Sequence, residues 1–104
     1  MRTTKKVWVN GTFDVVHRGH IELFKFAKSQ GDYLTVGIDT DRRIRENKGE
    51  GRPVNTQLDR KYFLEAIKYI DEVGIFDSDL ELLNMIAVYH PQCMVIGSDW
   101  MGKE

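Results

Sequence analysis

The sequence predicts an α/β protein, with a doubly wound parallel sheet between two layers of helices. Two observations carry this prediction. Short apolar segments alternate with longer amphipathic ones along the 104 residues, and neither a repeat nor a linker interrupts them. Strands that are separated by helices pair in parallel through right-handed crossovers, which leaves helices on both faces of the sheet. We therefore expect residues 1–104 to form a single three-layer α/β/α domain.

The expected strands are short and apolar, and each is bounded by a glycine, a proline or polar residues. They are Val7–Val9, Tyr33–Ile38, Val73–Phe76 and Cys93–Ile96. Ligands of such sheets bind at the carboxyl ends of the strands. The segments that directly follow these four strands are therefore the places where a functional site is expected.

Apolar side chains recur at helical spacing in three longer segments, which we expect to be helices. They are His20–Gln30, the stretch from Thr56 to Ile70, and the stretch from Ser78 to Tyr89, with Thr56 and Ser78 as N-caps. Residues 39–54 are polar and contain glycine, so we expect a long loop with one helical turn near 41–46 and with Arg42, Arg43 and Arg45 in solvent. The expected core includes Trp8, Phe24, Phe26 and Phe63.

The composition excludes several classes of protein. Hydrophobic residues make up 41% of the chain and charged residues 30%, as in ordinary globular domains. No apolar run approaches the roughly 20 residues of a membrane span, and residues 1–6 lack the pattern of a signal peptide. The one cysteine, Cys93, excludes an internal disulfide framework and a cysteine zinc site. We expect a cytoplasmic protein with no membrane partner.

Charge is unevenly distributed along the chain, although the net charge is only −1. Residues 1–38 carry six Lys or Arg against three Asp or Glu, whereas residues 71–104 carry one against seven. A basic first half favours an anionic ligand such as a polyphosphate. The chain as a whole is not basic enough to predict a nucleic-acid partner.

The segment Asn10–His20, which follows the first expected strand, has the composition of a phosphate site. Gly11 permits a sharp turn, and Gly19 permits a close approach of the backbone to a ligand. His20 stands at the start of the expected helix, where unpaired N–H groups favour an anion. His17 lies one turn earlier, so both imidazoles can face the same way and donate hydrogen bonds to phosphate oxygens.

Other interpretations of the histidines stay open at this point. A histidine taken alone is as often a structural residue as a ligand-binding one. Two histidines at this spacing can also bind a metal ion, but no third ligand has convincing spacing. The remaining histidine, His90, precedes Pro91 and is expected to cap the end of a helix. We therefore expect phosphate chemistry at Asn10–His20 and no metal ligands.

Gly11-Thr12-Phe13-Asp14, followed by His17-Arg18-Gly19-His20, resembles the signature of the cytidylyltransferase-like nucleotidylyltransferases, whose hallmark is a His-x-Gly-His motif after the first strand. Blocks similar to those of the family recur over nearly the whole chain, at Gly31–Leu34, Asp39–Asp41, Asp59–Lys61, Tyr69–Val73 and Gly97–Trp100. The resemblance implies a Rossmann-like fold and a nucleotidyltransferase. In this family a phosphate of the acceptor attacks the α-phosphorus of a nucleoside triphosphate in line, and pyrophosphate leaves.

The resemblance also implies roles for individual residues. The implied catalytic residues are His17, His20 and Lys48, and the implied nucleotide-binding residues are Gly11, Thr12, Phe13, Asp14, Gly19, Arg60, Gly97, Asp99 and Trp100. The two histidines would hold triphosphate oxygens and stabilise the transition state, while Asp14 would also fix the turn. Mg²⁺ would arrive with the triphosphate. Lys48 and Arg60 could instead be solvated side chains, and Trp100 could cover the sheet edge.

The substrate is predicted from two blocks that point in different directions. Gly97–Trp100 with Gly102-Lys103 is similar to glycerol-3-phosphate cytidylyltransferases, which favours transfer of a cytidylyl group from CTP to a small phosphorylated polyol or sugar. Lys48–Asn55 is similar to heptose-phosphate adenylyltransferases, which indicates the alternative of ATP and a heptose 1-phosphate-like acceptor. The glycerol-phosphate enzymes also use a lysine that Ser78–Tyr89 does not contain.

Family members carry a further strand and an Arg-Thr…Ser-Thr-Thr segment that binds the triphosphate, and the sequence stops at Glu104 before either. We therefore expect the domain to be incomplete at its C-terminus. A non-catalytic nucleotide-binding module is a further alternative for the same reason. The family tends to form dimers, so a homodimer is expected.

Overall fold

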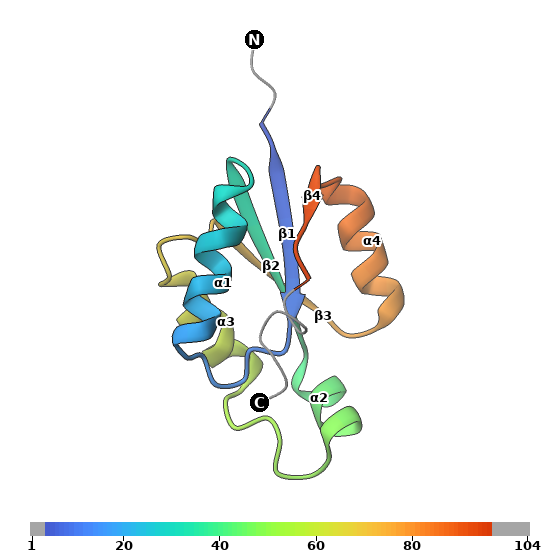
Figure 1. Cartoon of the computed structure of the whole chain (residues 1–104). Helices are drawn as coiled ribbons and strands as arrows, with labels where there is room; N and C mark the ends of the chain where they lie inside the picture. Colours follow the sequence, from blue (N-terminus) through green and yellow to red (C-terminus); the bar gives the residue numbers. More distant parts are fainter. Residues whose placement is uncertain (1–3, 97–104) are drawn as a thin grey trace.

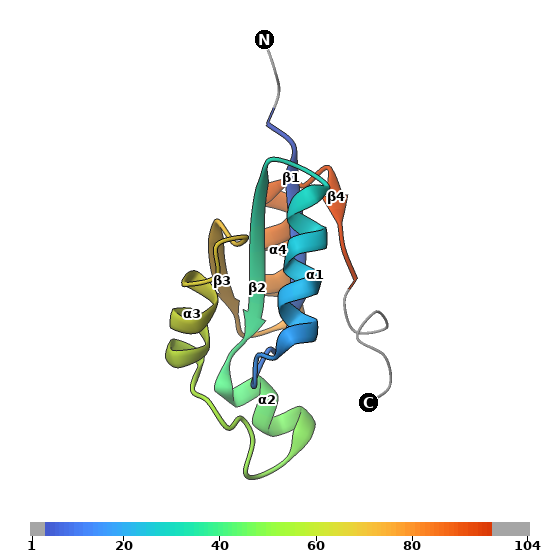
Figure 2. The same cartoon turned by 60° about the vertical axis from the view of Figure 1, so that its left-hand side comes forward.

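The computed structural model describes residues 4–96, which fold around a four-stranded parallel sheet (Figure 1). The elements are β1 (Lys6–Gly11), α1 (Arg18–Ser29), β2 (Tyr33–Asp39), α2 (Asp41–Lys48), α3 (Gln57–Glu65), β3 (Glu72–Phe76), α4 (Asp79–Tyr89) and β4 (Cys93–Met94). The strand order is β3-β2-β1-β4. Helices α1 and α3 cover one face and α4 covers the other (Figures 1 and 2). The predicted Rossmann-like α/β/α fold is confirmed. None of the helices within residues 4–96 is both long enough and apolar enough to pass through a bilayer.

The central strands β1 and β2 form the core because the residues in the middle of each strand are buried on both faces of the sheet. Val7 and Val9 point toward α1, and Trp8 between them points toward α4, since successive side chains of a strand alternate between faces. The indole of Trp8 lies over Gly37 on β2, where an added Cβ would come within 2.6 Å of Trp8 Cζ2. The glycine therefore makes room for the largest buried side chain. The predictions for Trp8 and Phe24 are confirmed, as both are almost fully buried.

Two core predictions are wrong, because Phe26 and Phe63 are each 45% exposed. Phe26 lies two positions after Phe24, and Phe63 lies one position before Leu64. Phe24 and Leu64 are fully buried, and a shift of one or two positions on a helix turns a side chain by 100° or 200° at 3.6 residues per turn. Both phenylalanines therefore lie outside the narrow stripe that packs on the sheet.

The loop predicted over 39–54 contains a complete helix, α2 (Asp41–Lys48), where only one turn was expected. The Thr40 hydroxyl caps it by accepting a hydrogen bond from the Arg43 amide. Elements elsewhere differ in their bounds. Helix α1 begins at Arg18 with His17 as its N-cap, α3 ends at Glu65, and β4 ends at Met94. The N-caps predicted at Thr56 and Ser78 are confirmed, and His90 is the C-cap of α4, as predicted.

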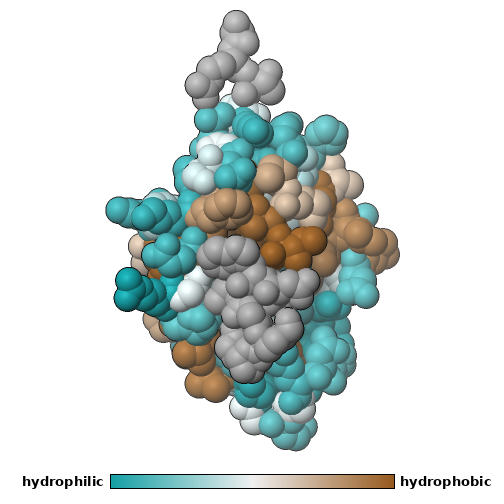
Figure 3. Space-filling view, in the orientation of Figure 1, coloured by the Kyte–Doolittle hydropathy of each residue, from teal (hydrophilic) through white to brown (hydrophobic). Residues whose placement is uncertain are grey.

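Several large apolar side chains are exposed on α4, on β4 and just after β4. They are Leu80, Leu83, Val88, Met94 and Ile96. The brown patch in Figure 3 lies over this region of the molecule. The predicted homodimer stays a prediction.

Candidate phosphate-binding site

The turn between β1 and α1 brings its two histidines into contact. Each backs the other at the N-terminus of α1: His17 Nδ1 accepts a hydrogen bond from the Gly19 amide at 3.0 Å, and His20 Nδ1 accepts one from the His17 amide at 3.1 Å. The result is a capping box in which imidazole nitrogens replace the usual side-chain oxygens. The two rings are stacked, with their centroids 4.0 Å apart and their planes at 30°. The predicted pairing of the imidazoles is confirmed.

These hydrogen bonds determine where each neutral imidazole carries its proton. A ring nitrogen that accepts an amide N–H uses its lone pair and cannot itself be protonated. Nδ1 is the acceptor in both His17 and His20, so Nε2 is the N–H donor in both rings. The turn therefore holds two stacked imidazoles in the same tautomer at the positive end of a 12-residue helix.

Phe13 supports His20 from the side of the core. Its ring is buried and meets the His20 ring edge to face, with centroids 5.2 Å apart and planes at 88°. The backbone of Phe13 has φ 48°, in the left-handed region that a phenylalanine rarely adopts. Its ring presses on Gly11, where a Cβ would lie 3.0 Å from two ring carbons. The strained turn therefore leaves little room for a side chain at position 11 and holds an imidazole in place, as strained backbone at functional sites often does.

Asp14 fastens the connection between α2 and α3 to this turn. Its buried carboxylate accepts hydrogen bonds from the Val54 and Asn55 amides, both at 2.8 Å, and from Arg52 Nε at 3.0 Å. The Asn55 side chain donates in return to the Asp14 carbonyl at 2.6 Å. Burial alone would raise the pKa of Asp14, but these donors outweigh it and hold the pKa below its usual value. Asp14 therefore fixes the turn, as the sequence indicated.

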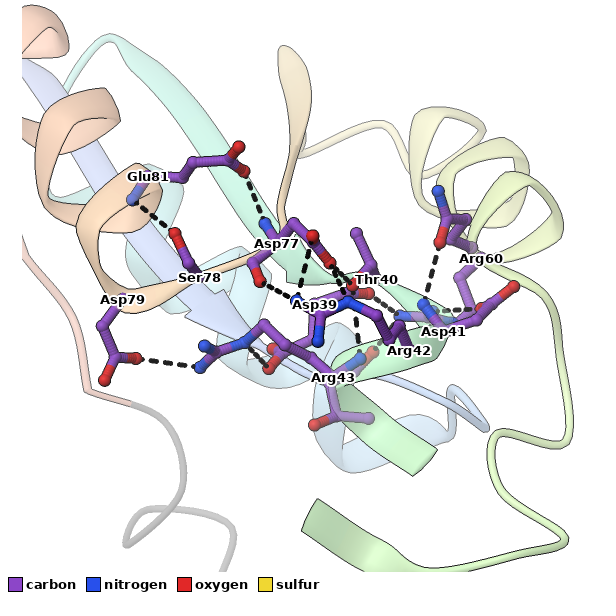
Figure 4. Close-up of polar contacts among 12 residues, drawn as sticks. Asp39, Thr40, Asp41, Arg42, Arg43, Arg60, Asp77, Ser78, Asp79 and Glu81 are labelled. Atoms are coloured by element: carbon purple, nitrogen blue, oxygen red, sulfur yellow. Dashed lines mark hydrogen bonds and ion pairs between the residues drawn. The ribbon is translucent and has the colours of Figure 1, made fainter. Parts of the chain in front are cut away.

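Arg60 is fully buried and joins four segments of the site. Nη1 donates to the Thr12 carbonyl at 3.1 Å and to the Asp39 carbonyl at 2.8 Å. Nε donates to the Asn55 carbonyl at 3.0 Å, and Nη2 forms an ion pair with Asp41 at 2.8 Å (Figure 4). Because Arg60 has no exposed surface and all these contacts are with the protein, its role is to position the four segments that it joins. The alternative in which Arg60 is a solvated side chain is therefore wrong, and its predicted contact with a nucleotide stays a prediction.

Two arginines at the start of α2 attach this helix to the ends of β2 and β3 (Figure 4). Arg43 donates from Nε to Asp39 at 3.1 Å and from Nη2 to Asp79 at 3.0 Å. Arg42 forms an ion pair with Asp77 at 3.0 Å, and together with Thr40 it holds the pKa of Asp77 below its usual value. The expectation that these two arginines are merely solvated is wrong. Asp39 lies only four positions before Arg43, but no local pattern could have revealed Asp77 and Asp79, which lie 35 and 36 positions away along the chain.

Lys48, the third residue predicted to be catalytic, is the last residue of α2 and is exposed. Along the chain, Lys48 lies between the start of α2, which Arg42 and Arg43 anchor, and the segment that Asp14 binds. Within residues 4–96, no three His, Cys, Asp or Glu side chains come close enough together to hold a metal ion.

The comparison with protein families decides what kind of domain this is. A family described as cytidylyltransferase-like matches residues 8–103, which is nearly the whole chain. The chain belongs to this cytidylyltransferase-like family. The turn with the stacked imidazoles lies inside the matched range, as do both arginine networks.

Curated relatives of this cytidylyltransferase-like domain are much longer than it is. The bifunctional protein HldE of Campylobacter fetus is 46% identical over 98 residues, which cover 94% of this chain and 21% of the relative. The bifunctional protein HldE of a Nitratiruptor species is 39% identical over 103 residues, which cover 99% of this chain and 22% of the relative. The chain thus spans about a fifth of the length of these proteins.

A solved structure shares the fold of this cytidylyltransferase-like chain. The lipopolysaccharide core biosynthesis protein of Thermoplasma volcanium superposes with a TM-score of 0.78 at 24% identity, over 88% of this chain and 73% of that one. This likeness concerns the arrangement of the elements.

The cytidylyltransferase-like domain brings most of the predicted site residues together around one turn. These are Gly11, Thr12, Phe13, Asp14, His17, Gly19 and His20, with Arg60 behind them. Gly97, Asp99 and Trp100 lie outside the described residues. The anchoring roles of Arg42, Arg43 and Asn55 could not be predicted from the sequence. Only the polar character of residues 39–55 hinted at them.

Proposed function

We propose that this chain transfers an adenylyl group from ATP to the phosphate of a heptose 1-phosphate-like sugar and releases pyrophosphate. Its membership of the cytidylyltransferase-like family supports nucleotidyl transfer. The bifunctional HldE relatives, together with the similarity of Lys48–Asn55 to heptose-phosphate adenylyltransferases, favour ATP and a sugar phosphate. Cytidylyl transfer to a polyol, which the sequence analysis preferred, has weaker support.

The observation that carries the proposal is the pair of stacked imidazoles at the N-terminus of α1. Both rings have Nε2–H as their donor, and the amides and dipole of the helix add positive potential. Two N–H donors fixed before the substrate arrives match the oxygens of a triphosphate. They also stabilise the negative charge that develops as phosphorus becomes five-coordinate.

The reaction follows from this arrangement. An oxygen of the sugar phosphate attacks the α-phosphorus of ATP, and the bond from that phosphorus to the bridging oxygen of the β-phosphate breaks. The electron pair leaves with pyrophosphate, so no covalent bond to the protein is needed. Mg²⁺ enters as part of the Mg–ATP substrate. Lys48, at the exposed end of α2, supplies a mobile positive charge to the phosphates.

The test is pyrophosphate release by the chain with ATP or CTP, each combined with a heptose 1-phosphate, a hexose 1-phosphate or glycerol 3-phosphate. We expect turnover with ATP and a sugar 1-phosphate. Turnover with CTP and glycerol 3-phosphate alone would restore the cytidylyl interpretation. Binding of ATP by calorimetry without product at any protein concentration would favour the non-catalytic module.

A substitution that keeps the helix cap separates catalysis from folding. His17→Asn retains a strong N-cap side chain but removes the imidazole donor. Loss of one such donor lowers turnover by about 100-fold to 1,000-fold. His90→Ala is the control, because His90 caps the end of α4. Unchanged turnover in His17→Asn would contradict the proposed mechanism.

A further inference from the structure

We propose that Arg52 is a phosphate-binding residue that Asp14 aims at the site, and that it takes a terminal phosphate group in bidentate fashion. This inference rests on the proposed function and names a recognition element of the same site. The terminal phosphate can belong to the sugar phosphate or to the nucleotide, because both carry one. The experiment below distinguishes the two sources.

Arg52 lies next to the turn that carries the histidines. Arg52 Nε donates to Asp14 Oδ2 at 3.0 Å. Asp14 lies three residues before His17 in the turn that carries both imidazoles. Three residues span at most about 11 Å of extended chain. The guanidinium group is therefore bound to the same short turn as the histidines, although it comes from a segment 38 positions further along the chain.

Only one edge of the Arg52 guanidinium is occupied. The side chain is 44% exposed, and within residues 4–96 it contacts the protein through Nε. Arg42, Arg43 and Arg60 differ from it because at least one terminal nitrogen of each donates to a protein oxygen. Nη1 and Nη2 of Arg52 carry four N–H groups in the planar fork that matches two oxygens of a phosphate.

Asp14 holds the Arg52 guanidinium in a fixed direction. Asp14 is buried and is itself pinned by the Val54 and Asn55 amides, so the carboxylate that aims Arg52 cannot rotate away. The chain before Arg52 is different: a Cβ at Gly49 or Gly51 would meet no atom within 4 Å. Arg52 thus lies between an open loop that contains Gly49 and Gly51 and the segment that Asp14 binds. A side chain ordered before binding loses less entropy when a phosphate arrives.

The chemistry of the reaction calls for such a residue. Two anions, the sugar phosphate and the triphosphate, must approach each other, and the site needs a cation beside the imidazole donors. A charge-assisted, bidentate contact adds both attraction and orientation. A lysine at this position would be a point charge without the fork.

The experiment compares Arg52→Ala, Arg52→Lys and Arg45→Ala in the full chain. Arg45 is the matched control, because it is an exposed arginine on the neighbouring helix and its side chain has no recorded partner within residues 4–96. Calorimetry gives the affinities for Mg–ATP and for a hexose 1-phosphate, and steady-state kinetics gives KM and kcat for each. Thermal unfolding is measured alongside to separate binding from stability.

We expect Arg52→Ala to lower the affinity for one of the two ligands by about tenfold to a hundredfold, which is the effect of losing a hydrogen bond to a charged group. Arg45→Ala should change either affinity less than twofold, and Arg52→Lys should recover only part of the loss. A loss confined to the sugar phosphate assigns the fork to the acceptor, and a loss confined to ATP assigns it to the nucleotide. Equal affinities in Arg52→Ala and Arg45→Ala for both ligands would overturn the proposal. Because affinity is measured without turnover, this result is independent of whether transfer occurs.

Discussion

Replacing Arg60 by Met tests whether the buried guanidinium holds the site together. Methionine has a similar length and apolar stem but no donor, so three backbone carbonyls and one carboxylate oxygen lose their partner. A net contribution of about 1 kcal/mol for each hydrogen bond gives a loss of about 4 kcal/mol. The buried methionine offsets about 1 kcal/mol of this loss through its apolar surface. The expected decrease in the free energy of unfolding is about 3 kcal/mol, out of the roughly 5–15 kcal/mol typical of a small domain.

The assay is equilibrium unfolding in urea, followed by far-ultraviolet circular dichroism. Lys61→Met is the matched control, because Lys61 is the next residue of α3 and pairs with Glu65 on the surface. Such exposed pairs contribute about 0.3–0.5 kcal/mol. A decrease in the free energy of unfolding below about 1 kcal/mol in Arg60→Met, no larger than that in Lys61→Met, would refute the reasoning. Buried carbonyls that lose their hydrogen-bond donors should cost more than that.

Three further predictions concern pH and packing. Because the folded-state pKa of Asp14 is lowered, its contribution to stability is complete above the unfolded value near 3.8 and is lost as pH falls through the folded value; Asp14→Asn should therefore be less stable than the wild type at neutral pH and nearly equal to it in strong acid, as acid titrations of both proteins would show. Burial is the main reason that the pKa of Tyr89 lies above 10.0, so stability should fall as pH rises past 10. Tyr89→Phe should flatten that alkaline decline in unfolding curves. The same variant should lower the free energy of unfolding by about 1 kcal/mol, because the hydroxyl contacts with two backbone carbonyls are lost. Gly37→Ala should lower the melting temperature by several degrees, since the added methyl group meets the Trp8 indole at 2.6 Å; an unchanged melting temperature would show that the indole can move aside.

The sheet and its order of elements could be predicted from the sequence because the alternation of apolar strands and amphipathic helices is a local signal. Helix α2 could not be recognised in full, since Ile44 is its only buried residue and its stability depends on ion pairs with Asp77 and Asp79. These partners become neighbours only when β2 and β3 pair. Periodicity also failed for Phe26 and Phe63, where the apolar stripe is broader than the surface that packs on the sheet.

The candidate site divides in the same way. His17 and His20 could be found from sequence because both lie in one short motif, and their spacing along a helix start dictates their contact. The attachments made by Asp14 and Arg60 span about 40 and up to 48 positions. A buried arginine that satisfies backbone carbonyls leaves no signature in its own neighbourhood, so its role appears only in the folded chain.

The central claim is that the turn after β1 offers two Nε2–H imidazoles to a polyphosphate. Nitrogen NMR of the isotope-labelled histidine side chains, during a titration with Mg–ATP, tests it most directly. We expect His17 and His20 to have an unprotonated Nδ1 in the neutral state and their Nε2 resonances to shift as ATP binds, while those of His90 stay in place. Resonances of His17 and His20 that show a protonated Nδ1, or that respond to ATP no more than those of His90, would contradict it.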